Sequence, residues 1–171
     1  MSYKETEQQY LERLAGYVAG QDPLMMQRAA VLNLAKLIEA VPEEALRQKP
    51  APEKWSVVEI LAHLAEDELV SSWRYRQMIE RTGATLAGFN QDEWARLGKY
   101  EEWNAREALG MFRMLREANL RMLAGLTAQQ WEREGIHAER GRMTVRDLAR
   151  HMAAHDVNHI LQIARVLGKS V

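Results

Sequence analysis

Three of the chain's five histidines lie four residues apart in the stretch HMAAHDVNH, residues 151–159. Residues four apart on an α-helix share one face, so His155 and His159 would project their rings in nearly the same direction. Two imidazoles at this spacing can bind one metal ion from a single helix. The residue after His155 is not glutamate, so the mechanism of the HExxH metalloproteases is not indicated.

His155 and His159 fall on the apolar stripe that periodicity predicts for residues 144–167. Burying polar groups without partners costs about 1–3 kcal/mol each, and a shared metal ion would satisfy both rings. His63, among the apolar positions of another predicted helix, offers a third nitrogen. Three neutral imidazoles and a water form an open site suited to Zn²⁺ or Ni²⁺, and also to Fe²⁺ or Mn²⁺. Hydrogen-bonded core histidines without a metal are the alternative.

Three further polar residues are candidates for supporting these ligands. His151 lies one turn before His155, but three consecutive turns drift by about 80° around a helix, which favours a supporting or structural role. Asp67 lies one turn after His63 and could bind the metal, orient a water or be a solvated acid. Asn158 could support the site from outside the ligand set.

Other residues carry weaker expectations. His137 follows Gly135 in a predicted loop and is expected to be solvated. Arg74 and Tyr75, near the middle of a predicted helix, could line a pocket. Trp55 directly precedes a helix start and is expected to pack as a hydrophobic staple.

Composition narrows the class of protein. A chain of 171 residues with a net charge of −1 predicts one domain and gives no sign of a nucleic-acid or membrane partner. The absence of cysteine excludes disulfides, thiolate metal ligands and a cysteine nucleophile. No stretch resembles a signal peptide or a membrane span, so a cytoplasmic location is expected. The arginines alternate with acidic residues on the predicted helices, which favours solvated faces.

Helix-forming residues dominate and strand signals are sparse, which predicts an all-α chain. Capping residues, periodicity and glycine stops predict four long helices and two shorter ones. Long connections between them, such as residues 83–100, predict a four-helix bundle with long crossover connections. We expect a single domain over residues 1–171, with residues 1–20 as an N-terminal helical extension. The long helices are expected at about 23–41, 56–81, 104–126 and 144–167, and the shorter ones at 4–18 and 127–133.

A weak internal repeat is also visible. WSVVEILAHLA, residues 55–65, aligns with MTVRDLARHMA, residues 143–153, so that cap, acid and histidine coincide. Either the bundle consists of two similar helix pairs, or both helices use common capping chemistry.

The motifs W-S-V-x-E-x-L-x-H-L and H-M-A-A-H-D-x-N-H-I-L-Q-I together resemble the DinB-like superfamily over roughly residues 24–168. The resemblance implies a four-helix bundle with a divalent metal, commonly zinc or nickel, on His63, His155 and His159. It also implies a homodimer in many members. The family often has a histidine where this chain has Asn158, which removes one polar group but leaves the triad intact.

Two classes of function follow. The first is a metal-dependent enzyme acting on a small molecule, either a hydrolase or a low-molecular-weight-thiol S-transferase, activities that the resemblance suggests. The metal would lower the pKa of a water or thiol in its open position. The lack of an obvious general base favours thiol transfer, and without cysteine the thiol must be a co-substrate. The second is a non-catalytic bundle, metal-stabilised or metal-free, that dimerises or binds a small ligand.

Overall fold

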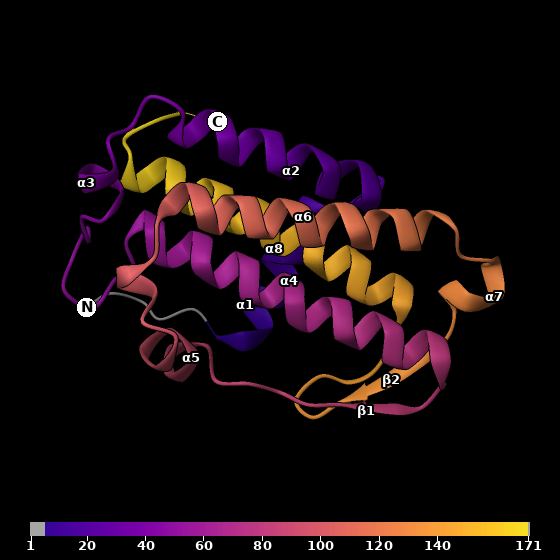
Figure 1. The fold of residues 1–171 in the computed structure, drawn as a ribbon. Helices are drawn as coiled ribbons and strands as arrows, with labels where there is room; N and C mark the ends of the chain where they lie inside the picture. The colour runs from indigo at the N-terminus through magenta and orange to yellow at the C-terminus, as the bar shows by residue number, and fades with distance from the viewer. Residues whose placement is uncertain (1–5, 171) are drawn as a thin grey trace.

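Four long helices form the body of the molecule: α2 (Pro23–Ile38), α4 (Val57–Glu80), α6 (Ala105–Ala124) and α8 (Val145–Val166) (Figure 1). The computed structural model describes residues 6–170. In it, α4 packs mainly against α6 and α8, and α2 packs against the same two helices. Helices α2 and α4 therefore lie diagonally opposite each other, as do α6 and α8. The predicted four-helix bundle is confirmed.

Side-chain caps fix the start of each long helix. Asp22 accepts hydrogen bonds from the backbone at the start of α2, where Pro23 is the first helical residue. Ser56 and Thr144 each form a reciprocal capping box with the acid three residues later, so the capping chemistry shared by the two halves of the weak repeat is present. Asn104 caps α6 through its side-chain oxygen. Because these signals are local, the sequence placed the helix starts correctly.

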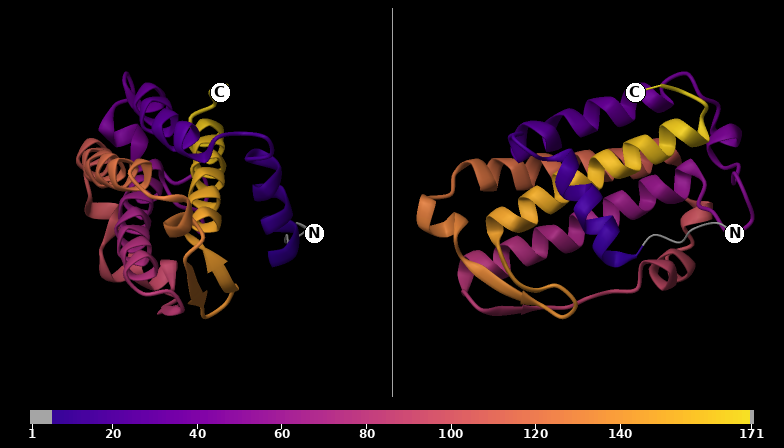
Figure 2. Two further views of the ribbon diagram at one scale, coloured as in Figure 1. Left: turned by 90° about the vertical axis from the view of Figure 1, so that its right-hand side faces the viewer. Right: turned by 180° about the vertical axis from the view of Figure 1, so that it is seen from behind.

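Shorter helices connect and flank the bundle. The leading helix α1 (Glu7–Tyr17) lies on the outside of the bundle and packs on α8 (Figure 2). The expected start of that helix at residue 4 lies outside the described residues. The connection after α4, expected only as a long connection over residues 83–100, contains helical segments that the sequence analysis did not predict. The remaining elements are α3 (Glu43–Leu46), α5 (Gln91–Leu97), the 3₁₀ turn η1 (Tyr100–Glu102) and α7 (Ala128–Trp131).

A small sheet covers one end of the bundle. It contains β1 (Ala84–Leu86), β2 (Glu134–His137) and β3 (Gly141–Thr144), with β2 parallel to β1 and antiparallel to β3. Gly135 lets β2 lie close to the bundle, because a Cβ there would be 2.7 Å from Leu86 Cδ1 and 2.9 Å from Met78 Cγ. Strands of three and four residues are too short for a period-two pattern, so the expectation of a chain without strands misses this sheet.

The bundle core has two apolar regions separated by polar side chains. Along α4, the apolar cluster of Val57–Ala65 is followed by buried Asp67, Glu68 and Ser71, and then by a second cluster that includes Tyr75 and Met78. Helix α6 shows the same order, and α8 shows the reverse order. The histidines of interest therefore lie in a buried polar layer in the middle of the bundle.

Arg116 on α6 belongs to this polar layer. It is fully buried and contacts Asp156 at 2.5 Å and Glu68 at 2.7 Å. The expectation that arginines on the helices face solvent is wrong at this position, because the two carboxylates come from other helices.

Within residues 6–170, no helix combines the length and hydropathy that a bilayer span requires.

Candidate metal centre

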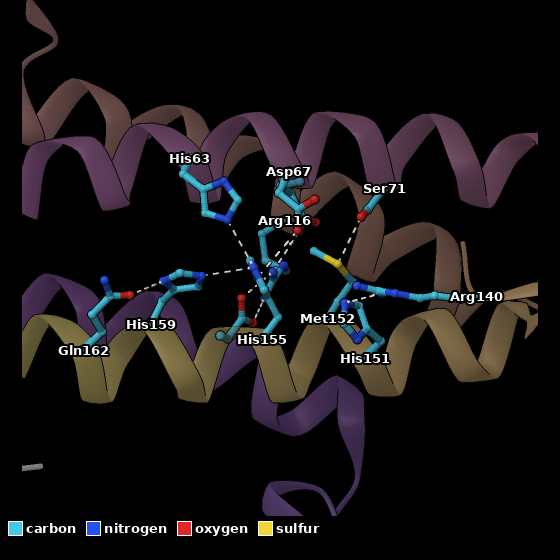
Figure 3. Close-up of polar contacts among 12 residues, drawn as sticks. His63, Asp67, Ser71, Arg116, Arg140, His151, Met152, His155, His159 and Gln162 are labelled. Atoms are coloured by element: carbon cyan, nitrogen blue, oxygen red, sulfur yellow. Dashed lines mark hydrogen bonds and ion pairs between the residues drawn. The ribbon is translucent and has the colours of Figure 1, made fainter. Parts of the chain in front are cut away.

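Three histidine rings from two helices converge on one point in the polar layer (Figure 3). His63 comes from α4, whereas His155 and His159 come from successive turns of α8. The Nε2 atom of His155 lies 3.2 Å from Nε2 of His63 and 3.1 Å from Nε2 of His159. All three side chains are buried, with exposed fractions between 2% and 8%. The three histidines predicted from the sequence therefore lie together, and each directs its Nε2 atom toward the others.

The local sequence explains this convergence. His63 lies between Ile60 and Leu64, which are buried in the apolar core, so its ring must also face inward. Ile160 and Ile163 anchor the corresponding face of α8. Because α4 packs directly against α8, the inward-facing rings meet.

Burial keeps the three rings neutral. It lowers the pKa of His63 to about 3, with a contribution from His159, and lowers the pKa of His159 to about 4. The pKa of His155 lies well below its usual range for the same reason, reinforced by its histidine neighbours. A neutral imidazole has one N–H donor and one acceptor nitrogen, so each ring can present a lone pair to a metal.

The outer nitrogens indicate which tautomer two of the rings adopt. His159 Nδ1 lies 2.8 Å from Gln162 Oε1, which can only accept, so Nδ1 carries the proton and Nε2 is the lone-pair nitrogen. His155 Nδ1 faces the Asp67 carboxylate at 3.5 Å. Carboxylate or amide oxygens behind a ligating histidine are the usual supporting partners in metal sites. Gln162 was not predicted, although its position three residues after His159 places it on the same helix face.

The donor set fits a divalent ion. Nε2 of His155 contacts two other nitrogens, but it has only one proton position, so hydrogen bonding alone can satisfy only one of these contacts. An ion at the centre satisfies all three lone pairs. Nitrogens bound at about 2.0–2.1 Å around a tetrahedral zinc ion lie roughly 3.3–3.4 Å apart, close to the separations here.

The supporting candidates occupy different positions. Asp67 is 8% exposed, and burial raises its pKa to about 6 against the opposing effect of Arg74. His151 accepts a hydrogen bond from Arg140 at 2.7 Å, and its ring centroid is 6.0 Å from that of His155. Asn158 instead accepts a hydrogen bond from Arg13 at 2.8 Å, which links α8 to α1.

His137 corrects one expectation. It was expected to be solvated in a loop, but it is the last residue of β2 and only 5% exposed. Its Nδ1 accepts backbone hydrogen bonds from Glu139 and Arg140. The pairing of β2 between β1 and β3 buries this residue, and the short strands gave no sign of it.

The triad borders two cavities. One of about 270 Å³ is lined by His63, Asp67, Arg74 and His155, together with residues of the β2–β3 turn. The other, about 310 Å³, is lined by His155, His159 and Trp55. Arg74 therefore lines a cavity as expected, whereas Tyr75 is buried in the core. Trp55 packs against His63, with ring centroids 5.1 Å apart, and lines the second cavity, so both cavities border the triad.

Comparisons with known proteins agree with this picture. Residues 28–163 match the family model of the DinB superfamily. A protein of Oceanobacillus iheyensis named "Putative metal-dependent hydrolase OB0413" is 19% identical over 138 residues, covering 81% of this chain and 79% of that protein. The structure of YfiT from Bacillus subtilis, described as "a probable metal-dependent hydrolase with an unusual four-helix bundle topology", superposes with a TM-score of 0.78 at 19% identity. That match covers 98% of this chain and 95% of YfiT.

Proposed function

The chain belongs to the DinB superfamily, and from this premise we propose that it is a metal-dependent hydrolase whose ion is held by His63, His155 and His159. The observation that carries the proposal is the meeting of three neutral Nε2 atoms beside a cavity. The names of the two relatives support the reaction class. A non-catalytic bundle would need no such accessible cavity.

Neutral nitrogen donors favour zinc or nickel as the ion. A divalent ion supplies Lewis-acid chemistry and lowers the pKa of a water or thiol that binds to it. Residues around the triad would orient the three histidine rings. Gln162 contacts the outer nitrogen of His159, the Asp67 carboxylate faces that of His155 at 3.5 Å, and Trp55 packs against His63.

Asp67 also supports hydrolysis over other reactions. Its carboxylate lines the same cavity as His63 and His155, where it can accept a proton from a nucleophile in that space. The sequence alone had shown no obvious general base and therefore favoured thiol transfer. The position of Asp67 beside the triad supplies the missing group.

Thiol transfer stays as a second candidate because of the two cavities. They meet at His155 and share Tyr10 and Gln91 on their borders, so two reactants could bind next to each other at the triad. A low-molecular-weight thiol in one cavity and an acceptor in the other would suit a transferase. Since the chain has no cysteine, the thiol would come from solution.

The test compares untagged protein, protein stripped by a chelator, and protein reloaded with zinc or nickel. Each form is assayed with chromogenic esters and amides, and for conjugation of low-molecular-weight thiols to chlorodinitrobenzene. We expect turnover in the reloaded protein, loss in the stripped protein and in His155→Ala, and retention in Asn158→Ala. Turnover in the stripped protein or in His155→Ala that equals the turnover of the reloaded wild-type protein would contradict the proposal.

A further inference from the structure

A buried arginine lies in the same cavity as the triad. Arg74 is on α4, three helical turns beyond His63, and is only 7% exposed. Its Nη2 donates to the carbonyl oxygen of Ala87 at 2.6 Å, whereas its buried Nε has no hydrogen-bond partner. Among the residues that the structure describes, no carboxylate lies within ion-pair distance of this guanidinium. A buried charge without a counter-ion is costly, and arginine cannot release its proton.

A second arginine faces the same space. Arg140 is exposed on the turn between β2 and β3, and it donates to His151 Nε2 at 2.7 Å (Figure 3). Burial lowers the pKa of Arg74, the charges of Asp67 and Glu139 raise it, and the charge of Arg140 lowers it. Both arginines line this cavity, so two like charges face the same space. Such an arrangement favours an anion between them.

The neighbouring groups are compatible with an anion. The Nδ1 of His137 accepts backbone hydrogen bonds, so the neutral ring carries its proton on Nε2 and adds a donor to the cavity lining. Two carboxylates also face this region. Asp67 lies beside His155 and Glu139 is exposed on the turn; both act on Arg74 through their charges, but neither forms a close ion pair with it.

We propose that Arg74 and Arg140 bind the anionic oxygen group of the substrate, a carboxylate or a phosphate, at the end of the cavity away from the triad. His63 and His155 line the other part of the same cavity, so an anion held by the arginines places the reacting bond next to the triad. Guanidinium groups match both anions through paired N–H donors. A cavity of about 270 Å³ limits the substrate to a small acid or phosphate ester. This assignment of substrate class rests on the proposed function.

Calorimetric titration of the purified protein with inorganic phosphate and, separately, with succinate tests the proposal. We expect one of the two anions to bind once per chain, and its identity to indicate a phosphate or a carboxylate substrate. Arg74→Gln and Arg140→Gln should each weaken that binding at least about tenfold, because each removes charge-assisted hydrogen bonds. Arg142→Gln is the matched control, since Arg142 is on the same hairpin but pairs with Glu134 at 2.5 Å outside the cavity.

Two further variants keep the outcome decisive. Arg140 is exposed, so Arg140→Gln should fold normally even if the loss of buried Arg74 disturbs the bundle; circular dichroism checks both. Anion binding that persists in His155→Ala would support the arginine site even if the metal centre proved absent. Undetectable binding of both anions to the wild-type protein, or equal binding by Arg140→Gln and Arg142→Gln, would overturn the proposal.

Discussion

At the scale of single residues, the orientation of each histidine distinguishes a metal centre from three buried rings. His159 Nδ1 contacts Gln162 at 2.8 Å, and His155 Nδ1 faces the Asp67 carboxylate at 3.5 Å, so an acceptor lies on the outer side of each ring. These contacts leave the Nε2 lone pairs directed at one another. Buried polar groups in such numbers are costly unless a further partner satisfies them.

Removing an outer acceptor should weaken metal binding without removing a ligand. We expect Gln162→Leu and Asp67→Asn each to lower the affinity for zinc about 10–100-fold, as is typical for residues that orient ligating histidines. Asn158→Ala should leave the affinity unchanged, because Asn158 contacts Arg13 rather than the triad. Competition with a chromophoric zinc chelator measures the zinc affinity of all three variants. Equal affinities for Gln162→Leu and Asn158→Ala would argue against the orienting role.

The pair His155 and His159 could be predicted from the sequence because helix geometry alone relates them, whereas His63 was proposed from its apolar neighbours and the family resemblance. Gln162 could have been found by the same helix geometry, because it lies three residues after His159.

The positions of Arg140 and His137 beside the cavity could not be predicted from the sequence. Their place beside the cavity depends on the β2–β3 hairpin and on the pairing of β2 with β1, which lies about fifty residues earlier in the sequence.

At the scale of elements, the capping boxes of α4 and α8 fix the helices that carry the ligands. In α4, Glu59 accepts a hydrogen bond from the Ser56 backbone at 2.8 Å and pairs with Lys49 at 2.8 Å. Burial alone would raise the pKa of Glu59, but the contacts with Lys49 and Ser56 outweigh it and hold the pKa below 4.5.

This depressed pKa predicts the pH dependence of a variant. A carboxylate with a lower pKa in the folded state stabilises the protein above its unfolded pKa, and that contribution is lost as the pH falls through the folded pKa. Glu59→Gln should therefore lower the free energy of unfolding by roughly 0.5–2 kcal/mol at neutral pH. The difference from wild type should shrink as the pH falls below 4.5.

Urea unfolding at a series of pH values measures this difference. Glu117→Gln is the control, because Glu117 is exposed and its nearest contact with Arg113 is 4.0 Å long. A difference for Glu59→Gln that grows with acidity would contradict the capping role.

Helices were predictable and strands were not, for one physical reason. Caps such as Thr144 with Asp147 act within a few residues, so the sequence alone shows where α8 begins. The pairing of β1 with β2 joins distant parts of the chain, and each of the three strands is too short to show its own period.

At the scale of the whole molecule, a polar layer divides the core and holds the helices in register. Arg116 on α6 contacts Asp156 on α8 and Glu68 on α4, and its Nη1 also donates to the carbonyl oxygen of Gln27 on α2. One side chain therefore joins all four bundle helices. Asp156 follows His155, and Glu68 follows Asp67, so the network fixes the same two helix turns that carry the candidate site.

Breaking this network should be costly. Arg116→Leu would leave two buried carboxylates without their partner, which typically destabilises a protein by about 3–5 kcal/mol. Arg113→Leu, on the same helix but exposed, should cost less than about 1 kcal/mol. Urea unfolding at neutral pH compares the two. Similar costs for both variants would show that the buried network contributes little to stability.

The sequence could not identify this layer, because arginines among acidic residues on a helix are usually solvated. Only the packing of α6 between α2 and α4 buries Arg116. The fold class followed from helix signals, whereas the polar interior followed from tertiary contacts.

The measurement that tests the metal centre most directly is the metal content of untagged protein by plasma mass spectrometry. Wild type, His155→Ala and His151→Ala would be compared before and after incubation with zinc or nickel. We predict one divalent ion per chain in wild type and in His151→Ala, and its loss in His155→Ala. A wild-type protein that contains no ion and takes up neither metal would contradict the metal centre and favour a ligand-binding or dimerising bundle.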